Sequence, residues 1–287
     1  MLGLNLVSRI SEIWPSETAV AARSQSQLQH LENRMSSVQG HLVQDDVAHS
    51  LPELIKRITP LWVINCIGIV KQSPAAESYS KCIEINSLLP HVLADACTAV
   101  NARLVHISTD CVFSGNVGDY RERDSPDACD LYGRSKALGE IDGRGHVMTI
   151  RTSIVGHGLH TKFGLIDWFL SEKGKVSGFT NAHFSGLTTN ELASTIIKIV
   201  DGSLFLSGIV NIPGPKISKY DLLLAVRDVY NKDIQIDPVG FPRIDRSLNG
   251  ERWEKFSGKS RKPWVDMLTD LYRWKRMQES IYNIAEC

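Results

Sequence analysis

The sequence lacks the features that mark membrane, metal-binding and nucleic-acid-binding proteins. No apolar stretch among its 287 residues approaches the roughly 18 residues that a membrane-spanning helix needs. Lys and Arg together number 32, as do Asp and Glu, so no basic excess favours nucleic acid. The six cysteines form no C-x-x-C pair, and the nine histidines fall in no metal-binding spacing. We therefore expect a cytoplasmic protein with reduced cysteines, no metal site and no membrane or nucleic-acid partner.

Helix and strand patterns alternate along the chain. The predicted helices are residues 2–13, 78–99, 131–142 and 163–172. The predicted strands are residues 18–22, 40–44, 61–70, 103–108 and 147–151. In the second helix we expect Leu88 and Leu89 on the apolar side. Such alternation predicts an α/β protein with a parallel sheet and helices on both faces.

The pattern in the last third of the chain predicts a second, smaller C-terminal part. It contains two helical patterns, at 189–200 and 218–230, and one strand pattern at 234–238. The tail after about residue 243 is rich in Arg, Lys and Trp and has no clear period, so the pattern assigns it no structure.

One pair of polar residues has a spacing that suits catalysis. Tyr132 and Lys136 are four residues apart in a predicted helix, so both side chains share one face. A nearby ammonium favours the phenolate, which predicts a lowered pKa for Tyr132 and a role in proton transfer. Thr109, at the end of the preceding strand, could hold a substrate carbonyl against the phenol. The alternative is an exposed helix with a solvated lysine.

Several segments in order resemble one family. STDCVFSG, YRERD, LYGRSKALGE and RTSIVG are similar to segments of dTDP-4-dehydrorhamnose reductase and its relatives, which are extended short-chain dehydrogenase/reductases. The resemblance runs from about residue 1 to near residue 250. It implies a Rossmann-like NADP-binding domain over 1–155 and a substrate-binding part over 156–287, interleaved with the first. The implied reaction is NADPH-dependent reduction of a keto group on a nucleotide-linked deoxysugar, for polysaccharide biosynthesis; a homodimer is left open.

The resemblance also implies roles for individual residues. Thr109, Tyr132 and Lys136 would be catalytic. The implied cofactor-binding residues are Gly3, Arg23, Ser24, Asp46, Val47, Asn65, Cys66, Ile67, Gly68, Asn86, Tyr132 and Lys136. The implied substrate-binding residues are Asp110, Val112, Phe113, Ser153 and Ile154.

Some of these residues have a structural alternative. Arg23 suits the 2′-phosphate of NADPH, or it is a solvated surface residue. Asn86 is equally a structural hydrogen bonder, Cys66 a small apolar residue and Phe113 a core residue. For Arg151, a phosphate-binding role and a structural role stand equal.

The sequence departs from the family in two places. It begins MLGLNLV, where the family has a first strand and a Gly-rich turn that receives the pyrophosphate. We expect the chain to be N-terminally incomplete; the alternative is a fold that starts at Met1 without that strand. Cys111 and Ile154 also replace the Tyr and Trp usual in the family, so the 4-keto-rhamnose nucleotide leads other deoxysugar nucleotides without excluding them.

Two other classes of function stay open. One is a non-catalytic regulatory subunit of the same fold. The other is a nucleotide-sugar epimerase or dehydratase, which keeps the Tyr–Lys pair but holds its cofactor tightly. Net oxidation of NADPH would distinguish a reductase from both.

Overall fold

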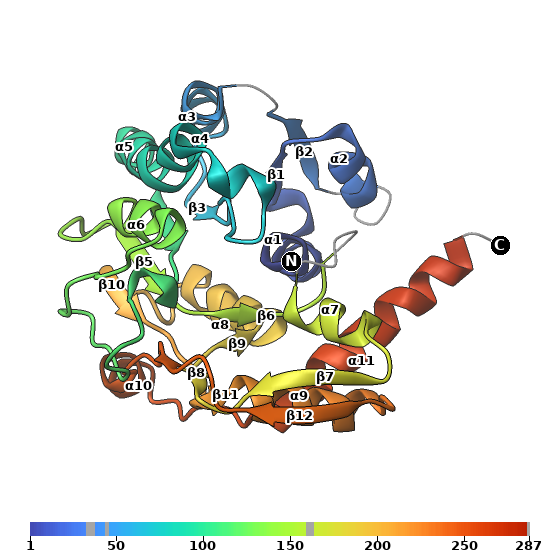
Figure 1. The fold of residues 1–287 in the computed structure, drawn as a ribbon. Helices are drawn as coiled ribbons and strands as arrows, with labels where there is room; N and C mark the ends of the chain where they lie inside the picture. Colours follow the sequence, from blue (N-terminus) through green and yellow to red (C-terminus); the bar gives the residue numbers. More distant parts are fainter. Residues whose placement is uncertain (33–37, 44–45, 159–163, 286–287) are drawn as a thin grey trace.

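The structure of the chain is a computed structural model that describes residues 1–32, 38–43, 46–158 and 164–285 (Figure 1). Its helices are α1 (Leu2–Ile13), α2 (Gln25–Glu32), α3 (Val47–Ile58), α4 (Tyr79–Cys82), α5 (Leu89–Ala99), α6 (Leu131–Leu138), α7 (Leu165–Ser171), α8 (Thr189–Val200), α9 (Lys219–Tyr230), α10 (Glu251–Ser257) and α11 (Trp264–Ala285). Its strands are β1 (Ala19–Ala22), β2 (Gln39–Leu42), β3 (Trp62–Asn65), β4 (Arg103–Ile107), β5 (Val147–Arg151), β6 (Ile154–Val155), β7 (Lys175–Phe179), β8 (Ala182–Phe184), β9 (Leu187–Thr188), β10 (Gly208–Asn211), β11 (Ile217–Ser218), β12 (Gln235–Val239) and β13 (Ile244–Asp245).

A four-stranded parallel sheet in the order β10-β5-β4-β3 carries the site. Neighbouring residues of β4 point to opposite faces, so Leu104 and Val105 enter two different hydrophobic cores. Helices α1 and α8 pack on the Val105 face, and helices α3 and α5 pack on the Leu104 face. The predicted α/β class, with a parallel sheet and helices on both faces, is confirmed.

Strands β1 and β2 form a separate parallel pair. Among the described strands, neither is hydrogen-bonded to β3 or to any other member of the larger sheet. Figure 1 shows the pair beside α2, on the side of the molecule away from β5 and β10.

Short strands and two long helices build the C-terminal part. Strand β12 pairs with β7, while β11 and β13 flank β8. The tail without a clear period forms α10 and α11, and Met267, Leu268 and Leu271 of α11 are buried in the same core as Val105. Figure 1 shows the far end of α11 extending away from the rest of the molecule.

Three predicted elements differ substantially in the structure. The apolar run 61–70 forms a strand only over β3, and the helix predicted over 131–142 ends at Leu138. The predicted helix 78–99 is helical but contains a π segment, Ile83–Leu88, which turns its buried face. Leu88 is therefore 50% exposed, whereas Leu89 is fully buried, so the prediction for Leu88 is wrong. Gln44 and Phe163, at the ends of two other predicted elements, lie outside the described residues.

Two searches of the described residues gave negative results. No helix among them is long and apolar enough to cross a bilayer. Within the same residues, no group of three or more His, Cys, Asp or Glu side chains is arranged to hold a metal ion.

Candidate active site

Thr109 lies where β4 leaves the sheet and the chain turns sharply. Its hydroxyl accepts a hydrogen bond from the Cys111 amide at 3.1 Å, which caps the short 3₁₀ turn Asp110–Val112. The Asp110 amide donates to the Thr152 carbonyl at 3.1 Å, so the turn is tied to the segment after β5. These bonds fix Thr109 at the carboxyl end of the sheet, where α/β proteins place their ligands.

Helix α6 brings Tyr132 to Thr109. Asp130 caps the helix by accepting from the Gly133 amide at 2.8 Å. A Cβ at Gly133 would lie 2.2 Å from the Cys111 carbonyl oxygen, so only glycine lets the first turn of α6 approach the 3₁₀ turn this closely. The phenol of Tyr132 is as a result close enough to the hydroxyl of Thr109 for the hydroxyl to affect its pKa.

The pKa of Tyr132 is raised, not lowered as the sequence predicts. Burial is the main cause, the charges of Cys111 and Asp110 add to it, and the hydroxyl of Thr109 only partly opposes it. The phenol therefore stays protonated at neutral pH. A protonated phenol beside a second hydroxyl is suited to donating a proton to a developing alkoxide.

Lys136 lies on the same face of α6, one turn further along. It is 5% exposed, and its ammonium donates to the Ile107 carbonyl at the end of β4 at 2.8 Å. Burial lowers its pKa from 10.5 to about 8, although the charges of Glu140 and Cys66 oppose the shift. The ammonium remains the dominant form at neutral pH.

Arg151 has a structural partner. It forms a bidentate ion pair with Glu140, Nε to Oε1 at 2.8 Å and Nη2 to Oε2 at 2.7 Å, and both side chains are almost completely buried. Its guanidinium also lies 4.9 Å from the centre of the Phe113 ring. The Ser108 hydroxyl donates to the same carboxylate at 2.7 Å. The structure thus favours the structural alternative for Arg151 over phosphate binding.

Asn86 lies in the π segment and connects two parts of the site. Its Oδ1 accepts from the Ile69 amide at 2.9 Å, and its Nδ2 donates to the Ile69 carbonyl and to Ser135, each at 3.1 Å. A Cβ at Gly139 would lie 2.0 Å from the Asn86 carbonyl oxygen, so α6 ends in close contact with the π segment. Asn86 therefore holds the chain after β3 against α6, one residue from Lys136.

The segment after β3 approaches the start of α1. Asn65 Oδ1 accepts from the Ile67 amide at 3.0 Å, and its Nδ2 lies 3.1 Å from Nδ1 of His106. A Cβ at Gly3 would be 3.6 Å from Cys66 Cβ, which is an ordinary contact, so packing here does not itself demand glycine. Desolvation raises the pKa of the Cys66 thiol to about 12, and the nearby positive charges of the amino terminus and Lys136 oppose that rise.

The remaining cofactor residues from the sequence lie further out. Arg23 is exposed just after β1 and makes no hydrogen bond or ion pair with the described residues. Ser24 accepts from the Gln27 amide at 3.3 Å at the start of α2. Asp46 caps α3 by accepting from the His49 amide at 3.2 Å, and Val47 is buried.

The five expected substrate residues fall into two groups. Asp110 is next to Thr109, and the Ser153 carbonyl accepts from the Leu187 amide at 2.8 Å, while Ile154 opens β6. Val112 and Phe113 are fully buried, and the Phe113 ring stacks on Tyr120 with their centres 4.1 Å apart. The structure thus places Val112 and Phe113 in a small hydrophobic core. Neither side chain has a surface that a substrate could contact.

Two charged residues near the site were not identified from the sequence. Glu140 follows Lys136 by four residues, a spacing that could have indicated their interaction. Lys219, at the start of α9, is close enough to Asp110 for each charge to affect the other's pKa. No local pattern joins Lys219 to Asp110, because only the packing of the C-terminal part brings α9 to the sheet.

The site residues fit a phosphorylated dinucleotide at both of its ends. Lys136 and the segment Asn65–Gly68 would hold a nicotinamide ribose, since the Lys136 ammonium lies at the end of β4 and that segment follows the neighbouring strand β3. Arg23 and Ser24 would hold a 2′-phosphate, because Arg23 has a guanidinium without a partner in the described residues. Between them, the first amides of α1 are free to face an anion.

Residues 13–241 match the RmlD substrate binding domain. The chain belongs to this family. The family resemblance found in the sequence is thereby confirmed.

Relatives of this RmlD-family chain include enzymes and an enzyme subunit. It is 28% identical over 243 residues to dTDP-4-dehydrorhamnose reductase of Mycolicibacterium smegmatis, covering 78% of this chain and 70% of the relative. It is 25% identical over 273 residues to Methionine adenosyltransferase 2 subunit beta of Xenopus tropicalis, covering 82% and 78%. The crystal structure of dTDP-4-dehydrorhamnose reductase from Bacillus anthracis in complex with NADP superposes with a TM-score of 0.72 at 20% identity, covering 90% and 99%. At that identity, the structural match establishes the fold.

Proposed function

We propose that the chain is an NADPH-dependent reductase of a keto group on a nucleotide-linked deoxysugar, with dTDP-4-dehydrorhamnose as the leading substrate. The observation that carries the proposal is the set Thr109, Tyr132 and Lys136, assembled at the carboxyl end of β4 with a protonated phenol. The M. smegmatis relative and the NADP complex of the B. anthracis enzyme support the choice of substrate and cofactor.

Each side chain has a distinct task in this proposal. Tyr132 donates its phenolic proton to the carbonyl oxygen of the substrate, and the Thr109 hydroxyl donates a hydrogen bond to the same oxygen. The Lys136 ammonium binds ribose hydroxyls and stabilises the phenolate left after proton transfer. When bound, NADPH supplies the hydride.

The test compares wild-type protein with Tyr132→Phe, measuring NADPH oxidation in the presence of dTDP-4-dehydrorhamnose. The substitution removes the proton donor and keeps the ring, so turnover should fall by ~10²–10⁴ while substrate binding changes little. Tyr79→Phe is the matched control, because Tyr79 is 70% exposed on α4. Wild-type turnover in Tyr132→Phe would disprove the role of Tyr132 as acid.

A second candidate is a non-catalytic regulatory subunit. The alignment with Methionine adenosyltransferase 2 subunit beta supports it, because that match covers most of both chains. The same assay separates the two: a regulatory protein would neither oxidise NADPH nor convert the sugar. Sugar conversion without net NADPH oxidation would instead indicate an epimerase or a dehydratase.

A further inference from the structure

His106 is a titratable side chain that the proposed mechanism does not use. It is fully buried in β4, three residues before Thr109. Its register partners in the sheet are Asn65 of β3 and Thr149 of β5. A polar side chain is unfavourable in the interior of a protein unless it is hydrogen-bonded, so the partner of His106 indicates what the residue does.

The hydrogen bond between His106 and Asn65 has only one possible arrangement. The Ile67 amide donates to Asn65 Oδ1 at 3.0 Å, and a backbone N–H cannot accept, so the carboxamide oxygen must face Ile67. Asn65 Nδ2, which can only donate, then faces Nδ1 of His106 at 3.1 Å. Nδ1 must therefore be unprotonated, and the neutral ring carries its proton on Nε2, which has no hydrogen-bond partner among the described residues.

The surroundings of His106 keep its ring neutral. Burial lowers the pKa of His106 well below its ordinary value, and the positive charges of Lys136 on α6 and His91 on α5 lower it further. The partners on the two neighbouring strands, Asn65 and Thr149, do not titrate. Protonation would turn a second donor toward Asn65 Nδ2 and break the bond, so the low pKa preserves it at physiological pH.

Asn65 transmits this constraint to the segment after β3. Its Oδ1 holds the Ile67 amide, and Asn86 holds the Ile69 amide at 2.9 Å and the Ile69 carbonyl at 3.1 Å. One carboxamide therefore fixes the start of the segment and another fixes its end. Without His106 the Asn65 carboxamide would be free to rotate, because its Nδ2 has no other partner in the described part of the chain.

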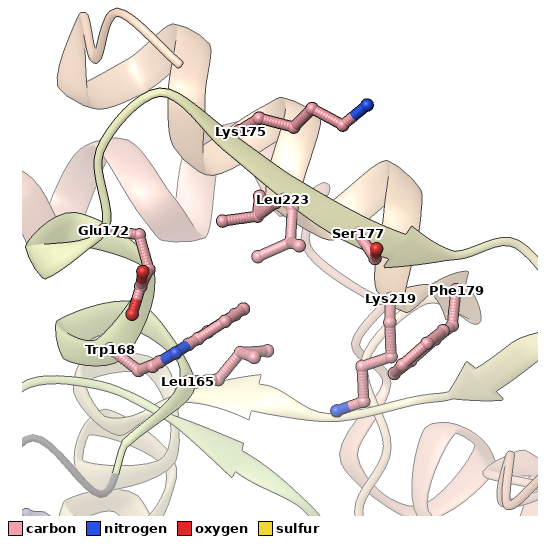
Figure 2. Close-up of a pocket in the computed structure, with 9 residues that line it drawn as sticks. Leu165, Trp168, Glu172, Lys175, Ser177, Phe179, Lys219 and Leu223 are labelled. Atoms are coloured by element: carbon pink, nitrogen blue, oxygen red, sulfur yellow. The ribbon is translucent and has the colours of Figure 1, made fainter. Parts of the chain in front are cut away.

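The cavity in Figure 2 is separate from these contacts. It has a volume of about 420 Å³ and lies between α7, β7 and α9, with Trp168, Lys219 and Leu223 among its lining side chains. No residue of β3, of β4 or of the segment after β3 lines it. We therefore expect a change at His106 to act through the sheet and not through that cavity.

We propose that His106 is a positioning residue for the cofactor, which holds the Asn65–Gly68 segment through Asn65 in the position that receives the nicotinamide ribose of NADPH. The inference rests on the proposed function for the identity of the cofactor. It adds a buried residue of β4 that acts on cofactor binding only through Asn65, and it assigns the His106 ring one tautomer.

The first test measures NADPH binding to the full chain by calorimetry. His106→Leu removes the acceptor and fills the space with an apolar side chain, so NADPH should bind about three- to tenfold more weakly. His106→Asn places a carboxamide oxygen where Nδ1 lies, so it should recover most of the affinity. His146→Leu is the matched control, because His146 bonds the Ala94 carbonyl at the opposite end of the sheet and should leave NADPH binding unchanged.

A double-mutant cycle separates positioning from a general loss of packing. Asn65→Ala removes the same link from the other side. His106→Leu should therefore weaken NADPH binding in the wild-type protein and have little further effect in the Asn65→Ala variant. In steady-state kinetics the KM for NADPH should rise in His106→Leu while kcat changes little, because Tyr132 and Thr109 keep their own contacts.

The tautomer of His106 is tested without any substitution. Long-range ¹H–¹⁵N spectra of the labelled wild-type chain should show a protonated Nε2 and an unprotonated Nδ1 in the His106 ring. This state should persist from about pH 6 to pH 8, the range in which an ordinary histidine titrates.

Three results would overturn the proposal. The first is wild-type NADPH affinity in His106→Leu, or a loss that is undiminished in the Asn65→Ala background. The second is a His106→Asn variant that binds as weakly as His106→Leu when both unfold at the wild-type temperature. The third is a His106 ring that carries a proton on Nδ1.

A wild-type chain that binds no NADPH would reject the proposed function instead. Hydrogen exchange of the Ile67 amide would then decide the role of His106, because it requires no cofactor. His106→Leu should speed this exchange and His146→Leu should not. Equal exchange in both variants would mean that His106 does not hold the segment.

Discussion

Burial moves the pKa values of Tyr132 and Lys136 in opposite directions. It raises the pKa of the Tyr132 phenol and lowers that of the Lys136 ammonium, because each neutral form needs less solvation. The Tyr132 phenol thus stays protonated, and Lys136 is the member of the pair that titrates near physiological pH. A phenol that stays protonated suits reduction of a carbonyl, because the substrate oxygen gains a proton in that reaction.

The pH dependence of activity should report Lys136. Its pKa of about 8 means that the ammonium is lost as the pH rises through that value. We expect kcat/KM for NADPH oxidation to fall above about pH 8, by about tenfold for each further pH unit. Tyr132 stays protonated over that range because its pKa is raised. A profile that stays flat to about pH 10 would show that the charge of Lys136 is not required.

The expected loss of activity above about pH 8 cannot arise from unfolding caused by the titration of Lys136. Its pKa in the folded chain lies below the ordinary value of 10.5, so between about pH 8 and that value the unfolded chain binds more protons. The contribution of Lys136 to the free energy of unfolding therefore rises with pH in this window. A thermal unfolding series at the same pH values separates the two effects.

Arg23 should select between the two nicotinamide cofactors. Arg23→Ala removes the exposed guanidinium that follows β1 and that we propose binds the 2′-phosphate. We expect a loss of about 1.5–3 kcal/mol in NADPH binding and no change for NADH. Calorimetric titration with both cofactors measures this. Equal losses for both would make Arg23 structural.

The sequence was sufficient to predict contacts between side chains of one helix or of adjacent elements. It was insufficient to predict the properties that depend on packing between distant elements. Tyr132 and Lys136 share a helix, and Thr109 follows the preceding strand β4, so their proximity could be predicted. The direction of the Tyr132 pKa shift could not, because burial depends on the whole fold. The role of Arg151 also could not be predicted from the sequence. Its partner Glu140 falls in the predicted helix 131–142, and the sequence does not show which face of that helix meets β5.

Among the elements, helix α6 does most to assemble the site. It carries Tyr132 and Lys136, it contacts the 3₁₀ turn through Gly133, and it ends at Gly139 against Asn86. Glu140, just beyond its end, fixes the helix to β5 through Arg151. Both ends of α6 are therefore held, and the catalytic face cannot rotate without breaking buried contacts.

Removal of the Glu140 charge should destabilise the fold. Glu140→Gln leaves the Arg151 guanidinium buried without its counterion, which should cost about 3–5 kcal/mol. Glu53→Gln is the matched control, because Glu53 forms an exposed pair with Lys56 and should leave stability unchanged. Urea unfolding followed by circular dichroism measures both. A Glu140→Gln variant as stable as the control would mean that the buried pair contributes nothing.

Helix existence was easier to predict than helix register. The pattern over 78–99 correctly indicated a helix, but six residues in π geometry change which side faces the core. No spacing rule based on a uniform α-helix could have placed Leu88 in solvent. Helix α11 was missed for a different reason: its buried Met267, Leu268 and Leu271 lie among many charged and aromatic residues that obscure the period.

At the scale of the whole molecule, one core joins the two parts of the chain. It contains Val105 and Met148 of the sheet together with Leu222 of α9 and Leu268 of α11. The second core, around Leu104, α3 and α5, lies on the opposite face of the sheet. The C-terminal elements are thus packed into the same hydrophobic unit as the strands that carry the catalytic residues.

The separation of β1 and β2 from the larger sheet has a consequence for local opening. Their ladder can break without disturbing the ladders of β4 and β5, so it belongs to a smaller cooperative unit. We expect the amide protons of β1 and β2 to exchange with deuterated solvent faster than those of β4 and β5, as mass spectrometry of peptic fragments would measure. Equal protection of the two ladders would show that they open together. Arg23 lies at the end of this ladder, so if NADPH binds there as proposed, it should slow the exchange of the β1 and β2 amides.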